Sequence, residues 1–191
     1  MLVIKSKRIA EGSERKIYRH PNDPKKIIKI NRDKGNNLQS KREIKFYNKL
    51  IKKCSNYQHI PEFYGVVKTS KGTGMVLDYI LDFDNSPSKS LAHYIEQNGV
   101  AFYVEKLGEL RDYFLNEGII FNYDIWPSNI LVKRTSEEDY HLVLIDALGD
   151  VVLIQWMNNF KYFLDAKILR RWSRFEARLK RKYSLSEDVF E

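Results

Sequence analysis

The chain has 191 residues, of which 43% are hydrophobic and 30% are charged, so it can bury a sizeable core. Its single cysteine, Cys54, excludes a disulfide framework, and no apolar run approaches the ~20 residues that span a bilayer. The first residues, MLVIKSKRIAEG, lack the pattern of a signal peptide. These features favour a cytoplasmic protein made of one domain or of two small lobes.

The formal net charge of +8 is concentrated near the C-terminus, where residues 167–182 contain eight Lys or Arg and one Glu. The same segment has an apolar stripe at helical spacing, with arginines expected on the other face: Ile168, Leu169, Trp172, Phe175 and Leu179. The segment could be a core-packed helix with a solvated charged face, or it could bind an anionic membrane surface from the inner side. We favour packing over membrane docking, and membrane docking over binding of nucleic acid or an acidic partner.

Residues 1–81 are predicted to form a small lobe that is rich in strands. Strands are expected over residues 1–10, 16–18, 26–30, 63–68 and 75–80, with turns at 20–24 and 69–73. Apolar residues recur at helical spacing over 38–53, which predicts one helix in this lobe. The polar stretch DFDNSPSKS, residues 82–90, is the expected linker to the next lobe.

Residues 82–191 are predicted to form a second, mainly helical lobe, so the whole chain is expected to be an α+β protein. Helices are expected over 91–97, 102–116 and 160–183, and Gly118 is expected to cap the second of them. Two short strands are expected over 130–132 and 142–145. The run VVLIQWM after Asp150 fits either a strand or the start of a buried helix.

Three polar side chains lie at the ends of the two strands in the second lobe. Asp124 and Asn129 precede the first strand in D-x-x-P-x-N-I-L, and Asp146 follows the second strand. Phosphoryl transfer from a nucleotide uses such a set: one carboxylate takes the proton of the acceptor hydroxyl, while an amide oxygen and another carboxylate bind magnesium. An Asp and an Asn around a Pro are also ordinary turn residues, so the motif alone leaves both interpretations open.

Two further polar residues lie in the first lobe. Lys29 is set among isoleucines in KIIKI, where a lysine usually faces solvent but can also bind phosphate. Glu43 lies inside the predicted helix, where a glutamate is usually solvated. A glutamate on the helix that follows a lysine-bearing strand can, however, pair with that lysine and direct it toward phosphate oxygens.

The layout of a five-stranded small lobe with one helix, followed by a helical lobe, resembles the protein-kinase-like superfamily. Within it the sequence resembles the YrbL family, a family named for the PhoP regulatory network. The resemblance rests on GSERKIYRHPNDPKKIIKI, KREIKFYNKL, IPEFYGVVKTSKGTGMVLDYILDFD and WPSNILV, which lie between residues 12 and 132. It implies a two-lobed, kinase-like domain that binds ATP and Mg²⁺.

The resemblance also implies a role for each matching residue. Nucleotide binding is implied for Gly12, Lys29, Glu43, Asp78, Tyr79 and Ile80, the last three through a hinge whose backbone would bind adenine. Asp124 corresponds to the catalytic base, and Asn129 and Asp146 to the magnesium ligands. We expect Lys29, Glu43, Asn129 and Asp146 to converge on one nucleotide site.

The chain departs from the protein-kinase pattern at several positions. The turn around Gly12 has one glycine instead of three, and Asn122-Tyr123 replaces the His-Arg before the catalytic Asp. Trp126 stands where protein kinases have a lysine, and it could either stack on a sugar ring or pack beneath the loop. These departures favour a kinase acting on a small hydroxylated or glycan acceptor over a protein kinase. They also leave open a pseudokinase-type regulatory or scaffold protein.

Overall fold

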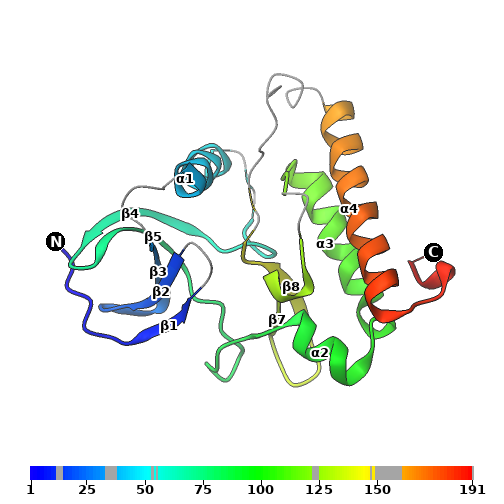
Figure 1. Cartoon of the computed structure of the whole chain (residues 1–191), viewed down its shortest axis with the longest axis horizontal. Helices are drawn as coiled ribbons and strands as arrows, with labels where there is room; N and C mark the ends of the chain where they lie inside the picture. The colour runs from blue at the N-terminus through cyan, green and yellow to red at the C-terminus, as the bar shows by residue number, and fades with distance from the viewer. Residues whose placement is uncertain are drawn as a thin grey trace. The chain divides into compact units, whose positions relative to one another are not determined.

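The structure is a computed structural model of a mixed α+β protein, and it describes residues 1–11, 15–32, 38–52, 54, 56–121, 125–146, 148 and 161–190 (Figure 1). The chain divides into two compact units, each with its own sheet. The first unit comprises residues 1–57 and 61–87, and the second comprises residues 58–60 and 88–191.

The first unit contains a five-stranded sheet in the order β1-β2-β3-β5-β4, and all its neighbouring strands are antiparallel. The strands are β1 (Arg8–Glu11), β2 (Arg15–His20), β3 (Asp23–Asn31), β4 (Phe63–Thr69) and β5 (Gly72–Asp78). The five strands expected from alternating and apolar runs are therefore present. The predicted turn over residues 20–24 is too long, because β3 already begins at Asp23.

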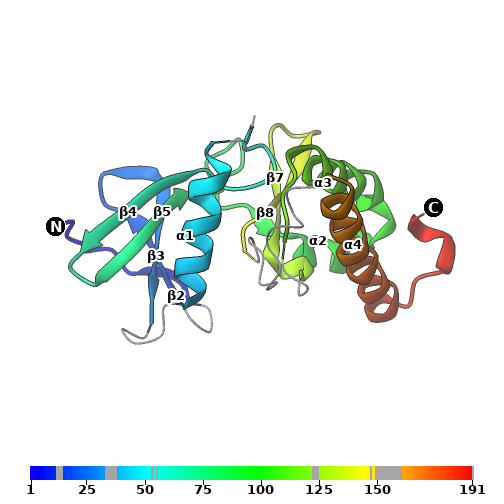
Figure 2. The same ribbon diagram turned by 90° about the horizontal axis from the view of Figure 1, so that it is seen from above.

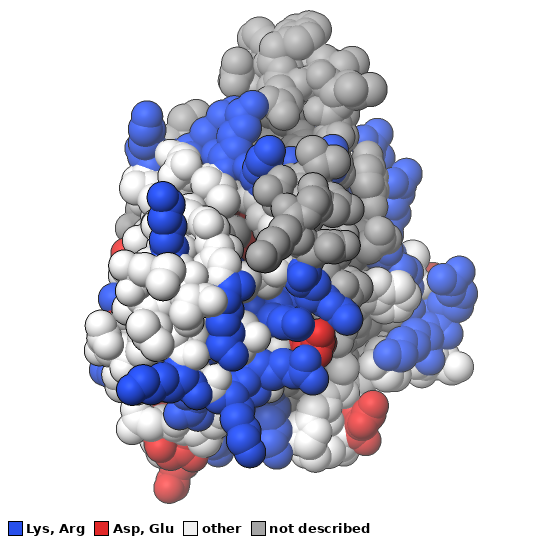
Figure 3. Space-filling view, turned by 60° about the vertical axis from the view of Figure 1, so that its left-hand side comes forward, with Lys and Arg blue, Asp and Glu red and all other residues white. Residues whose placement is uncertain are grey.

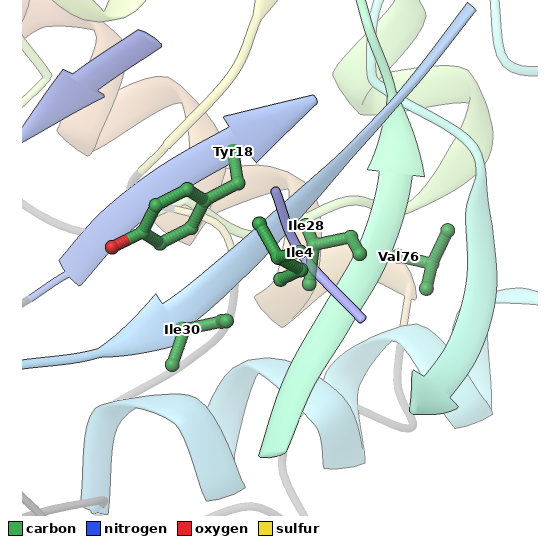
Figure 4. Close-up of a cluster of buried hydrophobic side chains, with 5 residues drawn as sticks. All are labelled: Ile4, Tyr18, Ile28, Ile30 and Val76. Atoms are coloured by element: carbon green, nitrogen blue, oxygen red, sulfur yellow. The ribbon is translucent and has the colours of Figure 1, made fainter. Parts of the chain in front are cut away.

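The two faces of this sheet are covered by different segments. Ile4 packs with Tyr18, Ile28, Ile30 and Val76 on one face (Figure 4). The predicted strand over residues 1–10 is wrong for its first half, because those residues cross the sheet instead of extending β1. The Leu2 backbone N–H donates to the Lys68 carbonyl at 2.9 Å and fixes this crossing.

Helix α1 (Leu38–Leu50) lies along the sheet, as the view from above shows (Figure 2). Its buried residues include Glu43, Tyr47 and Leu50. The ring of Tyr47 stacks on Phe63 of β4 with centroids 5.1 Å apart. Successive side chains of a strand point to opposite faces, so α1 reaches Lys29 of β3 and not Ile28.

The second unit contains a three-stranded sheet in the order β6-β7-β8 together with the remaining helices. Its elements are β6 (Lys89–Ser90), α2 (Leu91–Asn98), α3 (Val104–Glu117), β7 (Ile130–Arg134), β8 (Tyr140–Leu144) and α4 (Lys161–Tyr183). Gly118 adopts a left-handed φ of 62° after α3, which confirms the predicted cap. The predicted element after Asp150 lies outside the described residues.

Helix α4 packs into the core of the second unit through an apolar stripe. Ile168, Trp172, Phe175 and Leu179 are buried, and Trp172 contacts the rings of Phe114 and Phe121. The prediction was wrong for two members of this helix: Leu169 is 45% exposed, whereas Arg171 is fully buried. Among the described residues, no helix combines the length and apolar character that crossing a membrane requires.

Candidate functional site

A buried ion pair between β3 and α1 forms the first part of the candidate site. Lys29 is 6% exposed and Glu43 is 3% exposed, and Lys29 Nζ lies 3.7 Å from Glu43 Oε1. The pairing follows from the fold, because β3 is the central strand and α1 covers the face toward which Lys29 points. A lysine and a glutamate are seldom buried unless they are paired, so this position departs from the ordinary solvated interpretation of both residues.

Arg15, the first residue of β2, also contacts this pair. Its guanidinium donates to Glu43 Oε2, and its side chain is 7% exposed. Glu43 Oε1, the oxygen nearer to Lys29, accepts no hydrogen bond within the described residues. Arg15 therefore holds one carboxylate oxygen, while Lys29 lies beyond hydrogen-bond distance of the other. The sequence did not predict a role for Arg15, because nothing in the spacing of β2 distinguishes it from the neighbouring basic residues.

The predicted hinge lies at the end of β5, and part of its backbone is already engaged. The Asp78 N–H donates to the Glu62 carbonyl at 3.1 Å, and the Tyr79 N–H donates to the Lys25 carbonyl at 2.8 Å. Of the three hinge amides, only that of Ile80 makes no such bond to a loop or turn carbonyl in the described part of the chain. Gly12, the predicted phosphate-covering glycine, lies outside the described residues.

The side chain of Asp78 is tied into a polar cluster on the same edge. Its Oδ1 accepts from the Tyr64 hydroxyl at 2.9 Å, and its Oδ2 accepts from the Glu62 backbone N–H at 3.0 Å. Lys26 Nζ lies 3.9 Å from the centre of the Tyr64 ring. Burial, together with the Asp78 and Glu62 carboxylates, raises the pKa of Tyr64, so its hydroxyl stays protonated and keeps donating. The side chain of Asp78 is therefore held inside this cluster, and its backbone N–H is bonded to the Glu62 carbonyl.

In the second unit Asn129 and Asp146 lie on two backbone segments that run side by side. Asn129 ends the short 3₁₀ helix η2 (Pro127–Asn129) before β7, and Asp146 follows β8. The Ile145 N–H donates to the Asn129 carbonyl at 2.9 Å, so the two strand ends are held side by side. Both side chains are half-buried. Among the described residues, no group of three or more His, Cys, Asp or Glu forms a further candidate metal site.

Asp124 lies outside the described residues, but the structure shows what holds the chain on either side of residues 122–124. Arg171 of α4 donates to the Phe121 carbonyl, and Arg178 donates to the Ile125 carbonyl at 3.2 Å. Two arginines from one helix therefore fix both ends of this segment. The sequence carried a signal for Arg171: it lies three residues after Ile168 and four before Phe175, on the apolar side of the helix.

Trp126 is 42% exposed, and the guanidinium of Arg178 lies 5.3 Å from the centre of its ring. The interpretation in which Trp126 packs beneath the loop is therefore wrong, because the ring remains open to solvent. Its use as a stacking surface for a sugar stays a prediction.

A pair of histidines lies at β8, the strand that precedes Asp146: His141 belongs to this strand and His59 contacts it. His59 Nδ1 lies 2.7 Å from the Leu142 carbonyl, and the His59 and His141 rings are 5.8 Å apart. Burial lowers the pKa of His59, and burial together with Lys133 lowers the pKa of His141 to about 4. Both rings are therefore neutral at pH 7, and the Nδ1–H of His59 is the donor to Leu142.

The fold and these polar groups define the class: a mixed α+β protein with a buried lysine–glutamate pair in one unit and an asparagine and an aspartate on neighbouring strand ends in the other. The sequence profile of the family described as PhoP regulatory network protein YrbL matches residues 2–180. Relatives named "Uncharacterized protein YrbL" occur in Escherichia coli (strain K12) and Shigella flexneri. Each is 33% identical over 189 residues, covering 95% of this chain and 89% of the relative. The chain therefore belongs to the YrbL family.

Proposed function

We propose that the protein is a kinase-like phosphotransferase that uses ATP and Mg²⁺ in the cytoplasm, and that its two units correspond to the two lobes of that fold. The observation that carries the proposal is the buried contact between Lys29 and Glu43. Withdrawing two charges from water is unfavourable, and a carboxylate that holds a lysine in place offers a reason to retain them. In kinase-like enzymes such a pair places the amine against the nucleotide phosphates.

The proposed reaction transfers the terminal phosphoryl group of ATP to an acceptor hydroxyl. The Asp124 carboxylate takes the hydroxyl proton while the oxygen forms a bond to the γ-phosphorus. The bond from that phosphorus to the β–γ bridging oxygen breaks, and ADP leaves. Lys29 stabilises the negative charge on the phosphate oxygens, and the Ile80 amide contributes to adenine binding. Most of the rate enhancement in such a step comes from positioning and charge stabilisation.

Asn129 and Asp146 fit magnesium by the chemistry of their oxygens. The ion prefers hard oxygen ligands and often binds through one or two carboxylates together with substrate phosphates. The hydrogen bond from the Ile145 N–H to the Asn129 carbonyl holds the backbone segments that carry these two residues side by side. When bound, the ion neutralises charge on the transferring phosphates. The convergence of these residues with Lys29 and Glu43 on one nucleotide stays a prediction.

The proposed acceptor is a small hydroxylated molecule or a glycan. Trp126 takes the place of the lysine that protein kinases have in this loop, and its exposed ring suits a sugar face better than a peptide backbone. Arg178 beside the ring would fix its orientation.

A thermal-shift measurement with ATP and Mg²⁺ tests the proposal. At ~100 times its dissociation constant a ligand adds ~2.7 kcal/mol, which for a chain of this size raises Tm by roughly 5–10 °C. We expect this shift in the wild type and in Lys25→Ala, an exposed lysine of the same strand. We expect it to be lost in Lys29→Ala and Asp146→Asn, each compared with its own Tm without ligand. An equal shift in Asp146→Asn, or none in the wild type, refutes the proposal.

A pseudokinase-type scaffold is the second candidate, and the contact of Arg15 favours it. Arg15 occupies the Glu43 oxygen farther from Lys29, and an arginine so placed can hold the helix without any nucleotide. This candidate predicts a thermal shift without release of ADP, or no shift at all. Measuring ADP release alongside Tm separates the two.

A further inference from the structure

Helix α1 has a second face that the proposed reaction does not use. Its buried face carries Glu43, Tyr47 and Leu50. The opposite face, with the turn that follows it, carries five exposed cations within 12 residues: Lys41, Arg42, Lys45, Lys49 and Lys52. Lys41, Lys45 and Lys49 recur at i, i+4 and i+8, a spacing that places them in one line along the helix, and Lys52 lies in the turn that follows. We call these five residues the α1 basic stripe.

The α1 basic stripe has no neutralising partner in the described part of the chain. None of its five side chains makes a hydrogen bond or an ion pair there. The only acid in the helix is Glu43, which is buried against Lys29 and Arg15. Like charges four residues apart on a helix repel each other, so this arrangement is unfavourable for the helix itself. A helix that keeps these mutually repelling cations on its exposed face therefore points to an anionic partner.

The charge of the whole first unit supports this inference. Residues 1–57 and 61–87 contain 19 Lys or Arg and 9 Asp or Glu, so this unit has a net charge of +10. The second unit has 14 basic and 16 acidic residues, and its net charge is −2. Without residues 167–182, which hold eight Lys or Arg and one Glu, the second unit has 6 basic and 15 acidic residues and a net charge of −9. The near-neutral remainder expected outside residues 167–182 is thus the sum of +10 in the first unit and −9 in the second. Figure 3 shows one face of the molecule on which Lys and Arg far outnumber Asp and Glu.

We propose that the α1 basic stripe docks on an anionic membrane surface through charge attraction. Clusters of four to eight Lys or Arg on a helix recognise anionic lipid headgroups, and the stripe has five. Four of its five cations are lysines, whose compact, strongly hydrated charges suit a diffuse anionic plane better than a shaped acceptor. Ile51, which is 50% exposed beside Lys52, adds one aliphatic contact at the end of the stripe.

The composition of the stripe argues against other partners. Cores of protein interfaces are depleted of lysine and enriched in aromatic residues, and the stripe shows the opposite composition. Proteins that bind single-stranded nucleic acid stack bases on aromatic side chains, which the stripe lacks. Docking by this helix is independent of the proposed phosphotransfer, because neither Lys29 nor Asp146 takes part in it.

Vesicle sedimentation tests the inference. Wild-type protein is mixed with vesicles of phosphatidylcholine alone, or with vesicles in which phosphatidylglycerol replaces part of the phosphatidylcholine. We expect binding only to the anionic vesicles, with a steep loss at high salt. Each lysine contributes about a five-fold change in partitioning, so Lys41→Gln/Lys45→Gln/Lys49→Gln should bind on the order of 100-fold more weakly.

A matched control removes the same charge from elsewhere in the first unit. Lys5, Lys25 and Lys68 are exposed and outside α1, and their triple Gln variant should bind within a few-fold of the wild type. Equal losses in both triple variants would mean that net charge and not the stripe is responsible, which overturns the proposal. Absence of vesicle binding overturns it as well. Binding of a duplex oligonucleotide in place of vesicles would reassign the stripe to nucleic acid.

Discussion

Helix α1 has four Lys or Arg among its 13 residues and α4 has nine among its 23, so by composition both are basic amphipathic helices. In α4 at least six of the nine cations interact within the chain. Arg171 and Arg178 bond to backbone carbonyls, Lys161 pairs with Asp165, and Lys180 pairs with Glu187. Lys167 and Arg174 also interact with other residues. In α1 none of the cations on the exposed face is engaged within the described residues. The number of cations in a helix therefore does not reveal which of them are available to a partner.

Removing one arginine from each helix should produce the largest difference between α1 and α4. Arg171→Ala should lower the free energy of unfolding by about 3 kcal/mol, because it leaves a cavity and removes the donor to the Phe121 carbonyl. Arg42→Ala, on the exposed face of α1, should change it by less than about 0.5 kcal/mol. Urea unfolding at pH 7 measures both. Equal losses would show that Arg171 is not a buried structural residue.

Much of the fold was readable from the sequence because hydrophobic periodicity is a local signal. The five strands of the first unit, the α1 helix and the Gly118 cap all follow from spacing or from one conformationally special residue. The failures have tertiary causes. Residues 1–10 were expected to form one strand, yet their first half packs across the sheet through Ile4.

The candidate site was readable in its residue types but not in its contacts. The lysine-bearing strand and the glutamate-bearing helix predicted Lys29 beside Glu43, and the structure places them 3.7 Å apart. The contact between Arg15 and Glu43 was not predictable from the sequence, because it depends on how β2 and α1 pack against each other. Arg171 was assigned to a solvated face, although its spacing already placed it among the apolar residues. A formal charge in a sequence carries no information on whether the fold provides a buried acceptor.

The two units should also differ in their response to acid, because the second contains the neutral pair His59 and His141. The unfolded chain takes up protons on these rings near pH 6.5, whereas burial holds the pKa of folded His141 at about 4. The unfolded state therefore binds more protons in this window, and stability is lost as pH falls from 6.5 toward 4. After discounting for partial exposure, His141 accounts for about 1–2 kcal/mol.

Urea unfolding at pH 7 and at pH 5 measures this effect. His141→Gln should reduce the difference between the two values, and the residual difference should come partly from His59, whose pKa is lowered in the same direction by burial. His20→Gln, in the first unit, should leave the difference unchanged. A His141→Gln profile that coincides with the wild type would mean that the ring is already protonated in the folded protein at pH 5.

The smallest expected effect is also the one with the most informative sign. Lys45 lies four residues from both Lys41 and Lys49, so Lys45→Glu converts two repulsive pairs into attractive ones. Each such pair contributes about 0.2–0.5 kcal/mol of either sign, so reversing two of them changes the free energy of unfolding by at least about 0.8 kcal/mol. We expect a rise near this lower bound, about 1 kcal/mol at low salt, because the pair with Lys41 has the less favourable order, with the Glu on the C-terminal side. The gain should shrink in 1 M salt, where charges are screened over about 3 Å. Arg174→Glu in α4, where Arg174 does interact with other residues, should lower stability instead. A loss in Lys45→Glu would mean that the α1 basic stripe already has an acidic partner within the chain, and the contrast between the two helices would then disappear.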